Sequence, residues 1–302
     1  MTVHEAKEII NDYYLSESHT EEEEFVFEEA QHFLIDAMHD PNDMHNLAWH
    51  YAEERKFDLY LKYLEMAAEY QFYPSYESLG YLWYYGQTGT VDYEKAFYYF
   101  NLGAGSKDDY IRISCEYKIA DMYRYGYFVE KDEEKYRTII ERLFEEVSHP
   151  EDLNTIISME FYPEPALSYR VAEIRIAQGK MQEAKRLLQE ARTQFAIYLQ
   201  SNPSWWGNIE EMESVVMLMH ENAFYADRKP DLYDIFWLAK SEGKLSFNYL
   251  GQRFTVHFVA EDGGIVIKFE DKWYRDANSF LEKAMIGGRP VTALYNKLTE
   301  YK

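Results

Sequence analysis

Residues 78–100 read SLGYLWYYGQTGTVDYEKAFYYF and contain nine aromatic side chains. From Leu79 onward, apolar residues recur at i, i+3 and i+4, which places them on one face of a helix. Gly86 follows where a helix ends well in the left-handed conformation, and Asp92 is a good N-cap for a second helix. The stretch therefore predicts a helix, a turn and another helix.

The same pattern returns 40 residues later, which indicates an internal repeat. In the first helix and turn, the corresponding residues are Leu79, Leu82, Trp83 and Gly86 against Ile119, Met122, Tyr123 and Gly126. In the second helix they are Asp92, Lys95, Tyr99 and Phe100 against Asp132, Lys135, Ile139 and Ile140. Repeats of this length, with helical periodicity in each half, predict stacked helix pairs.

These residues resemble the Sel1-like repeat family, a relative of the tetratricopeptide repeat with a longer turn between its two helices. The first unit carries the match at Leu79-Gly80, Tyr84, Gly86, Gly89, Val91, Asp92 to Ala96, Tyr99 and Gly103-Ala104. The resemblance covers about residues 43–199, where Leu47-Ala48 and Ala67-Ala68 fit a preceding unit. A later unit at 166–195 looks more like a tetratricopeptide repeat, with Ala172, Gly179, Ala184 and Ala191 at the small-residue positions.

The rest of the chain predicts two flanking parts. Residues 21–38 form an expected amphipathic helix within a set of N-terminal capping helices at 1–42, before a repeat domain at 43–241. From Leu245 the apolar period changes to two, with turn residues at 250–251 and 262–264, which predicts an antiparallel β-meander. Helices are expected within 278–301. The fold class is thus mainly α, a Sel1/TPR-like helix–turn–helix solenoid, with a small C-terminal α+β module at 242–302.

Composition limits the function classes. The chain has 31 basic and 54 acidic residues, a net charge of −23, so nucleic acid and anionic membranes are poor partners and a basic protein or peptide is favoured. Cys115 is the single cysteine, which excludes an internal disulfide. The first residues, MTVHEAKEIINDYYLS, do not read as a signal peptide, and we expect a cytoplasmic protein.

The predicted binding surface is the helix face opposite the core, because in families of this kind the first helix of each unit lines the inner groove. It consists of His45, Trp49 and Glu53, then Glu77, Tyr81, Tyr84 and Tyr85, then Tyr117, Asp121, Arg124 and Tyr125, then Tyr169 and Glu173. Tyrosines supply broad contacts and carboxylates favour basic ligands. The competing interpretation is that several of these tyrosines pack between repeats.

No pattern in the sequence indicates chemistry. His45 and His50 point about 140° apart on a helix, and His32 and His39 lie about 10.5 Å apart along it, so neither pair holds one ion. We therefore predict no metal, cofactor or catalytic residue. The predicted function is a protein-binding adaptor, and the alternative is an acidic inhibitor or immunity-type protein that blocks a basic enzyme such as a nuclease.

Overall fold

The computed structural model describes residues 1–16, 19–54, 56–148, 164–201, 206–225, 232–261, 264–274, 277–294 and 297. The described chain forms two compact units that meet in sequence within one helix, after Leu143. That boundary lies inside the range 43–241, which the sequence analysis treats as one repeat domain. The predicted domain boundaries after residues 42 and 241 stay predictions.

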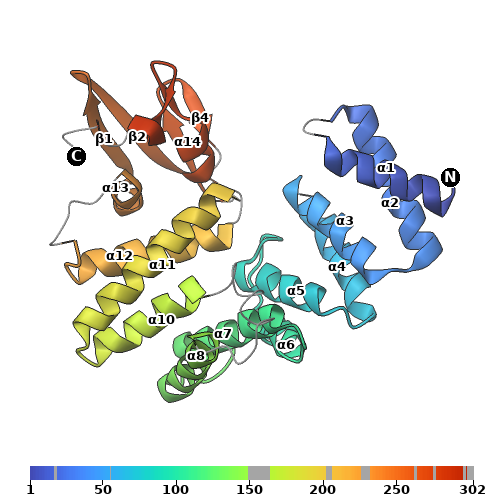
Figure 1. The fold of residues 1–302 in the computed structure, drawn as a ribbon, viewed down its shortest axis with the longest axis horizontal. Coiled ribbons are helices and arrows are strands. Elements are labelled where there is room, and N and C mark those ends of the chain that lie inside the picture. The colour runs from blue at the N-terminus through green and yellow to red at the C-terminus, as the bar shows by residue number, and fades with distance from the viewer. Residues whose placement is uncertain are drawn as a thin grey trace. The chain divides into compact units, whose positions relative to one another are not determined.

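The first unit is built from consecutive helices, and the first seven pack one on the next in chain order (Figure 1). They are α1 (Val3–Leu15), α2 (Glu21–Met38), α3 (Pro41–Glu53), α4 (Phe57–Glu69), α5 (Tyr73–Tyr85), α6 (Tyr93–Gly103), α7 (Asp109–Tyr125) and the start of α8 (Glu133–Ser148). In addition, α5 packs on α7. This neighbour-to-neighbour packing is that of a helical repeat solenoid and confirms the predicted fold class for this unit.

The turns of the two central repeats have the same end residues and the same capping hydrogen bonds. Gly86 and Gly126 end α5 and α7 with φ of 67° and 71°, the left-handed conformation predicted for them. Asp92 accepts from the backbone of Lys95 at 3.0 Å, and Asp132 does the same for Lys135 at 2.9 Å. In each repeat the lysine ammonium also lies 3.8 Å from the centroid of an aromatic ring in the preceding helix. The sequence repeat is therefore a structural repeat.

Close packing within the first central repeat depends on a glycine. Gly80 in α5 faces the fully buried ring of Phe100 in α6, and a Cβ on Gly80 would lie 2.5 Å from two of the ring carbons. A methyl group cannot fit without displacing that ring, because protein interiors are close-packed. The predicted small-residue position of the repeat is thus confirmed by its packing.

Gly80→Ala is expected to lower the free energy of unfolding of the first unit by about 1–3 kcal/mol, the usual cost of overpacking. Urea denaturation followed by circular dichroism measures this change. Phe100→Leu in the same chain should recover part of the loss, since it removes the ring that the new methyl group meets. Helix propensity alone favours alanine by about 1 kcal/mol, so a stabilised Gly80→Ala variant would contradict the prediction.

The second unit begins with another helix bundle. Its helices are α10 (Glu164–Ala177), α11 (Met181–Ser201), α12 (Trp206–Glu221), α13 (Leu232–Ala239) and the 3-10 turn η2 (Lys240–Glu242). The pair α10 and α11 turns at Gly179, with φ of 73°, where the sequence predicts a tetratricopeptide-like turn. Helix α12 packs on both α10 and α11, and α13 connects α12 to the sheet.

The predicted β-meander is confirmed. Strands β1 (Lys244–Tyr249), β2 (Gln252–Glu261), β3 (Gly264–Phe269) and β4 (Lys272–Tyr274) pair antiparallel in chain order. Leu250 and Gly251, both at positive φ, form the first turn, as two-residue hairpins favour. Asp262 and Gly263 of the second predicted turn lie outside the described residues.

The last part of the chain contains α14 (Ala277–Lys283), β5 (Met285–Ile286), β6 (Arg289–Pro290) and α15 (Val291–Leu294). Helix α14 packs on β3 and β4. The two short helices agree with the expectation, whereas the β5–β6 pair between them was not predicted. Among the described helices, none combines the length and the apolar character needed to span a membrane.

Candidate functional site

Part of the predicted tyrosine face joins α5 to α7. The Tyr81 hydroxyl shares hydrogen bonds with the Tyr117 hydroxyl at 2.7 Å and with Ser114 Oγ at 2.9 Å. Tyr117 and Ser114 are buried. These hydroxyls are therefore used to connect the two helices, which is the competing interpretation given for the tyrosines.

A buried lysine, which was not predicted, lies at the centre of this region. Lys118 Nζ donates to the Tyr85 hydroxyl at 2.8 Å and lies 3.7 Å from Asp121 Oδ2. The ammonium also lies 5.1–5.6 Å from the centroids of four tyrosine rings: Tyr81, Tyr84, Tyr85 and Tyr117. Cation–π attraction and the carboxylate together compensate for the burial of this charge. We call Lys118 and these four tyrosines the tyrosine cage.

The cage corrects two predicted contact residues. Tyr117 and Asp121 are 8% and 4% exposed, so they offer almost no surface to a partner. Asp121 faces Lys118, which balances its charge instead of leaving it to attract a ligand. The helical period correctly places both residues on one face of α7, but α5 packs on that face. Both residues therefore serve helix packing.

Glu77 is a third residue whose predicted role changes. Burial raises the pKa of its carboxyl group to about 8, and a nearby Asp108 adds to the rise, while a hydrogen bond with Ser114 opposes it. A carboxyl group with that pKa is mostly protonated at neutral pH. Glu77 therefore does not supply the negative charge that was expected to set ligand preference.

Other members of the predicted face stay at the surface. Trp49 is 38% exposed, and its Nε1 donates to His45 Nε2 at 3.0 Å. Burial lowers the pKa of His45 to about 4, and the neutral ring carries its proton on Nδ1, 3.0 Å from Ser75 Oγ. The indole is thus held in place by a chain of hydrogen bonds. The side chain of Glu53 lies outside the described residues.

Arg124 and Tyr125 lie at the C-terminal end of α7. Tyr125 is 47% exposed, and the Arg124 guanidinium lies 5.0 Å from its ring centroid and 5.2 Å from that of Tyr136. The guanidinium therefore lies against two aromatic rings, and one of its nitrogens donates to the Tyr136 hydroxyl at 3.5 Å. Arg124 stays a predicted member of the binding surface.

The last two predicted residues, Tyr169 and Glu173, line a groove in the second unit. The groove has a volume of about 470 Å³ and is lined by residues of α10 and α12 and by Lys240 of η2. Its lining residues are Tyr169, Glu173, Glu210, Glu213, Ser214, Met217, Leu218, Glu221 and Lys240. Four carboxylates thus face one lysine, and Lys240 pairs with Glu213. We call this cavity the acidic groove.

A buried ion pair holds the two walls of the acidic groove together. Both terminal nitrogens of Arg170 in α10 donate to Glu211 in α12, at 2.9 and 2.8 Å, and Arg170 also donates to the carbonyl of Ala166. Arg170 is 2% exposed. This bidentate geometry fixes the distance and orientation of the two helices that carry the acidic residues.

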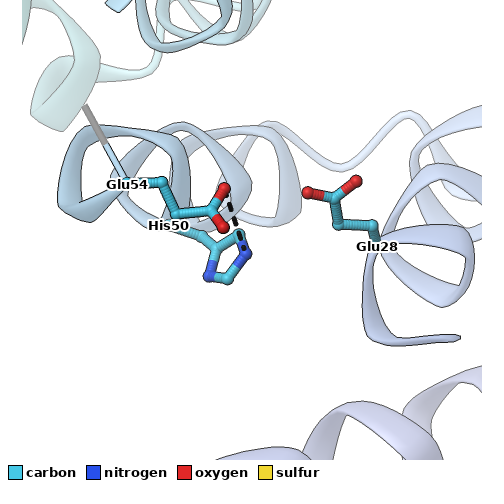
Figure 2. Close-up of side chains that lie close together, drawn as sticks. All are labelled: Glu28, His50 and Glu54. Atoms are coloured by element: carbon cyan, nitrogen blue, oxygen red, sulfur yellow. Dashed lines mark ion pairs between the residues drawn. The ribbon is translucent and has the colours of Figure 1, made fainter. Parts of the chain in front are cut away.

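Metal-binding residue types meet at one place in the described part of the chain. Glu28 from α2, with His50 and Glu54 from α3 and its C-cap, offer donor atoms that all lie within 4.8 Å of one another (Figure 2). The spacing of histidines along single helices does not reveal this set, because Glu28 comes from a different helix. Its signal, a histidine and a glutamate four residues apart, is common on helix surfaces and gives no hint of Glu28.

Comparisons with known proteins give a limited result. No family model matches this sequence, and no curated protein matches it. A crystal structure of a Sel1 repeat protein from Oxalobacter formigenes is similar over 78% of this chain and 82% of its own, with 15% sequence identity and a TM-score of 0.43. The helix–turn–helix repeat fold rests on the helix pairs and matching turns described above.

Proposed function

We propose that this protein is a non-catalytic adaptor that binds a basic segment of another protein in the acidic groove. The observation that carries the proposal is the lining of the groove, with four carboxylates against one lysine. Lysine or arginine side chains of a partner would complement this charge. The net charge of −23 would also speed the approach of a basic partner.

The groove also offers apolar surface. Tyr169, Met217 and Leu218 are half-buried and lie among the carboxylates. Methionine adapts to different ligand shapes, and tyrosine provides contact area at low entropic cost. A ligand that alternates basic and apolar side chains fits this lining better than a purely basic one. The partner is therefore expected to present a short segment of mixed basic and apolar residues.

Removing the charge of the groove is expected to weaken binding at least tenfold. The variant combines Glu173→Gln, Glu210→Gln and Glu221→Gln, which keeps side-chain size and leaves the Arg170–Glu211 pair intact. The probe is a fluorescein-labelled peptide of about eight residues that alternates arginine with leucine or tyrosine, measured by fluorescence anisotropy. Interfacial charge pairs of this kind are commonly worth more than 1.4 kcal/mol in total, which is tenfold in affinity.

The matched control removes the same charge elsewhere. Glu65, Glu94 and Glu130 are exposed acids of the first unit, and their triple Gln variant should bind the peptide within about twofold of the wild type. Equal weakening by both triple variants would mean that general charge attraction explains binding. Equal affinity of wild type and groove variant would remove the groove from the proposal.

Salt dependence separates the adaptor from the inhibitor alternative. An inhibitor that mimics phosphate through its acidic surface should lose most of its affinity as ionic strength rises. An adaptor that also uses Tyr169, Met217 and Leu218 should retain much of its affinity, because apolar contacts are not screened. Measuring the same peptide at low and high salt decides between these two.

The exposed aromatic residues of the first unit are a separate proposed contact surface. Trp49 and Tyr125 are the most exposed members of the predicted face, at 38% and 47%. Tyr84 and Tyr85, which belong to the tyrosine cage, and Arg124 are half-buried. Exposed aromatic side chains of this kind are enriched at protein interfaces. This surface is secondary to the acidic groove in the proposal.

A further inference from the structure

We propose that Glu28, His50 and Glu54 form a binding site for a divalent transition-metal ion such as Zn²⁺. One imidazole nitrogen and two carboxylate oxygens are available, all within 4.8 Å of one another. Zinc takes such nitrogen and oxygen ligands at about 2.0–2.2 Å, so two ligands of one ion lie about 3–3.5 Å apart. Glu54 is exposed, so a change of its side-chain rotamer can shorten the distances between the ligand atoms to this range.

The main evidence for the site is the environment of His50. Its side chain is 10% exposed, and its Nε2 has no hydrogen-bond partner, because the nearest acidic oxygen, Glu54 Oε2, is 3.8 Å away. Buried polar atoms in folded proteins are almost always bonded, so a buried nitrogen without a partner calls for an explanation. Figure 2 shows the ring turned toward the Glu54 carboxylate, with Glu28 facing the pair from α2. A metal ion at this position would satisfy the nitrogen.

The ring of His50 is also fixed in orientation. It packs edge-on against Phe27, with the ring centroids 4.9 Å apart, and against Tyr13 at 6.0 Å. These contacts come from α2 and α1, so the ring is held by its neighbours before any ligand binds. A pre-oriented ligand loses little conformational freedom on binding a metal ion. The site would cross-link α2 to the end of α3.

Lys56 acts as the competitor for this position. Its Nζ lies 2.7 Å from Glu54 Oε2 and 3.4 Å from Glu28 Oε1, so an ammonium bridges the two carboxylates that the metal would use. The Lys56 side chain is 46% exposed and can move into solvent. The carboxylate pair therefore already binds a cation, and a divalent ion with access to His50 would replace it. This competition lowers the affinity of the wild-type site.

The test is isothermal titration of the metal-free, full-length protein with Zn²⁺, supported by the visible absorption of the Co²⁺ complex, which reports nitrogen and oxygen coordination. We expect one ion per chain. Glu28→Gln and His50→Gln should each weaken binding at least tenfold, and Lys56→Met should tighten it at least tenfold. Glu29→Gln, an exposed acid next in sequence to Glu28, is the control and should leave affinity unchanged.

Two results would overturn the proposal. One is the absence of one-to-one binding in both the wild type and Lys56→Met, which would mean that Lys56 is the only cation this cluster accepts. The other is equal affinity of Glu28→Gln, His50→Gln and Glu29→Gln, which would mean that ions bind the acidic surface in general. Circular dichroism checks folding, and Glu28→Gln alone decides the question if His50→Gln does not fold, since Glu28 is only half-buried.

Discussion

Arg170→Ala is expected to lower the free energy of unfolding of the second unit by about 3–5 kcal/mol, the usual cost of removing one partner of a buried ion pair. The substitution leaves the Glu211 carboxylate, 11% exposed, without the two nitrogens that now bind it. Urea denaturation followed by circular dichroism and tryptophan fluorescence measures the loss. Because the chain has two units, the two transitions are fitted separately.

Arg186→Ala is the matched control in the same unit. Arg186 pairs with Glu190 on the surface of α11, where the two side chains are 62% and 49% exposed. Exposed pairs contribute about 0–1 kcal/mol, so this variant should stay near the wild type. The double variant Arg170→Met, Glu211→Leu should lose less than Arg170→Ala, because no uncompensated charge is left. Equal losses for Arg170→Ala and Arg186→Ala would show that the buried pair adds no stability.

The first unit is expected to lose stability as the pH rises from about 4.5 to 8. The Glu77 carboxyl group has a pKa of about 8 in the folded state, against an ordinary value of 4.5, with burial as the largest cause. In this range the folded chain binds more protons than the unfolded chain, so unfolding becomes easier as the pH rises. Each pKa unit corresponds to about 1.4 kcal/mol, and for this half-buried group we expect a loss of about 2–4 kcal/mol.

Glu77→Gln tests the assignment. Glutamine keeps the size and the polarity of the protonated carboxyl group but does not ionise, so the variant should lose this part of the pH dependence. Urea denaturation of both proteins at a series of pH values gives the comparison. A variant with the same pH profile as the wild type would show that another group is responsible.

Local signals in the sequence predicted the helix ends correctly. Gly86, Gly126, Asp92 and Asp132 act through the backbone within a few residues of themselves, so their role needs no knowledge of the tertiary fold. The β-turn at 250–251 was predictable for the same reason. Spacing and cap residues together therefore determined the repeat architecture.

The binding surface was harder to predict, because it depends on which helix covers which face. The period of α7 shows that Tyr117 and Asp121 share a face, but it does not show that α5 packs there. The burial of Lys118 was not predicted, because a single lysine in a helix is normally solvated. Here Lys118 is 3% exposed inside the tyrosine cage. Glu28 and His50 belong to different helices, and only the packing of α2 on α3 brings them together.

The acidic groove could be predicted only in part from the sequence. Tyr169 and Glu173 were predicted from the repeat offsets, and they do line a cavity. Its other acids, including Glu210 and Glu221, come from α12, which lies beyond the range that resembles the repeat family. The sequence identified one wall of the groove, and the tertiary fold supplied the other.

The single thiol of the chain makes the two units separable by experiment. Cys115 is fully buried in α7 next to Gly103 of α6, and burial raises the pKa of its thiol well above the ordinary value. A thiol in this state reacts with an alkylating reagent only while α6 and α7 are apart. With no other cysteine in the chain, the labelling rate reports opening of the first unit alone.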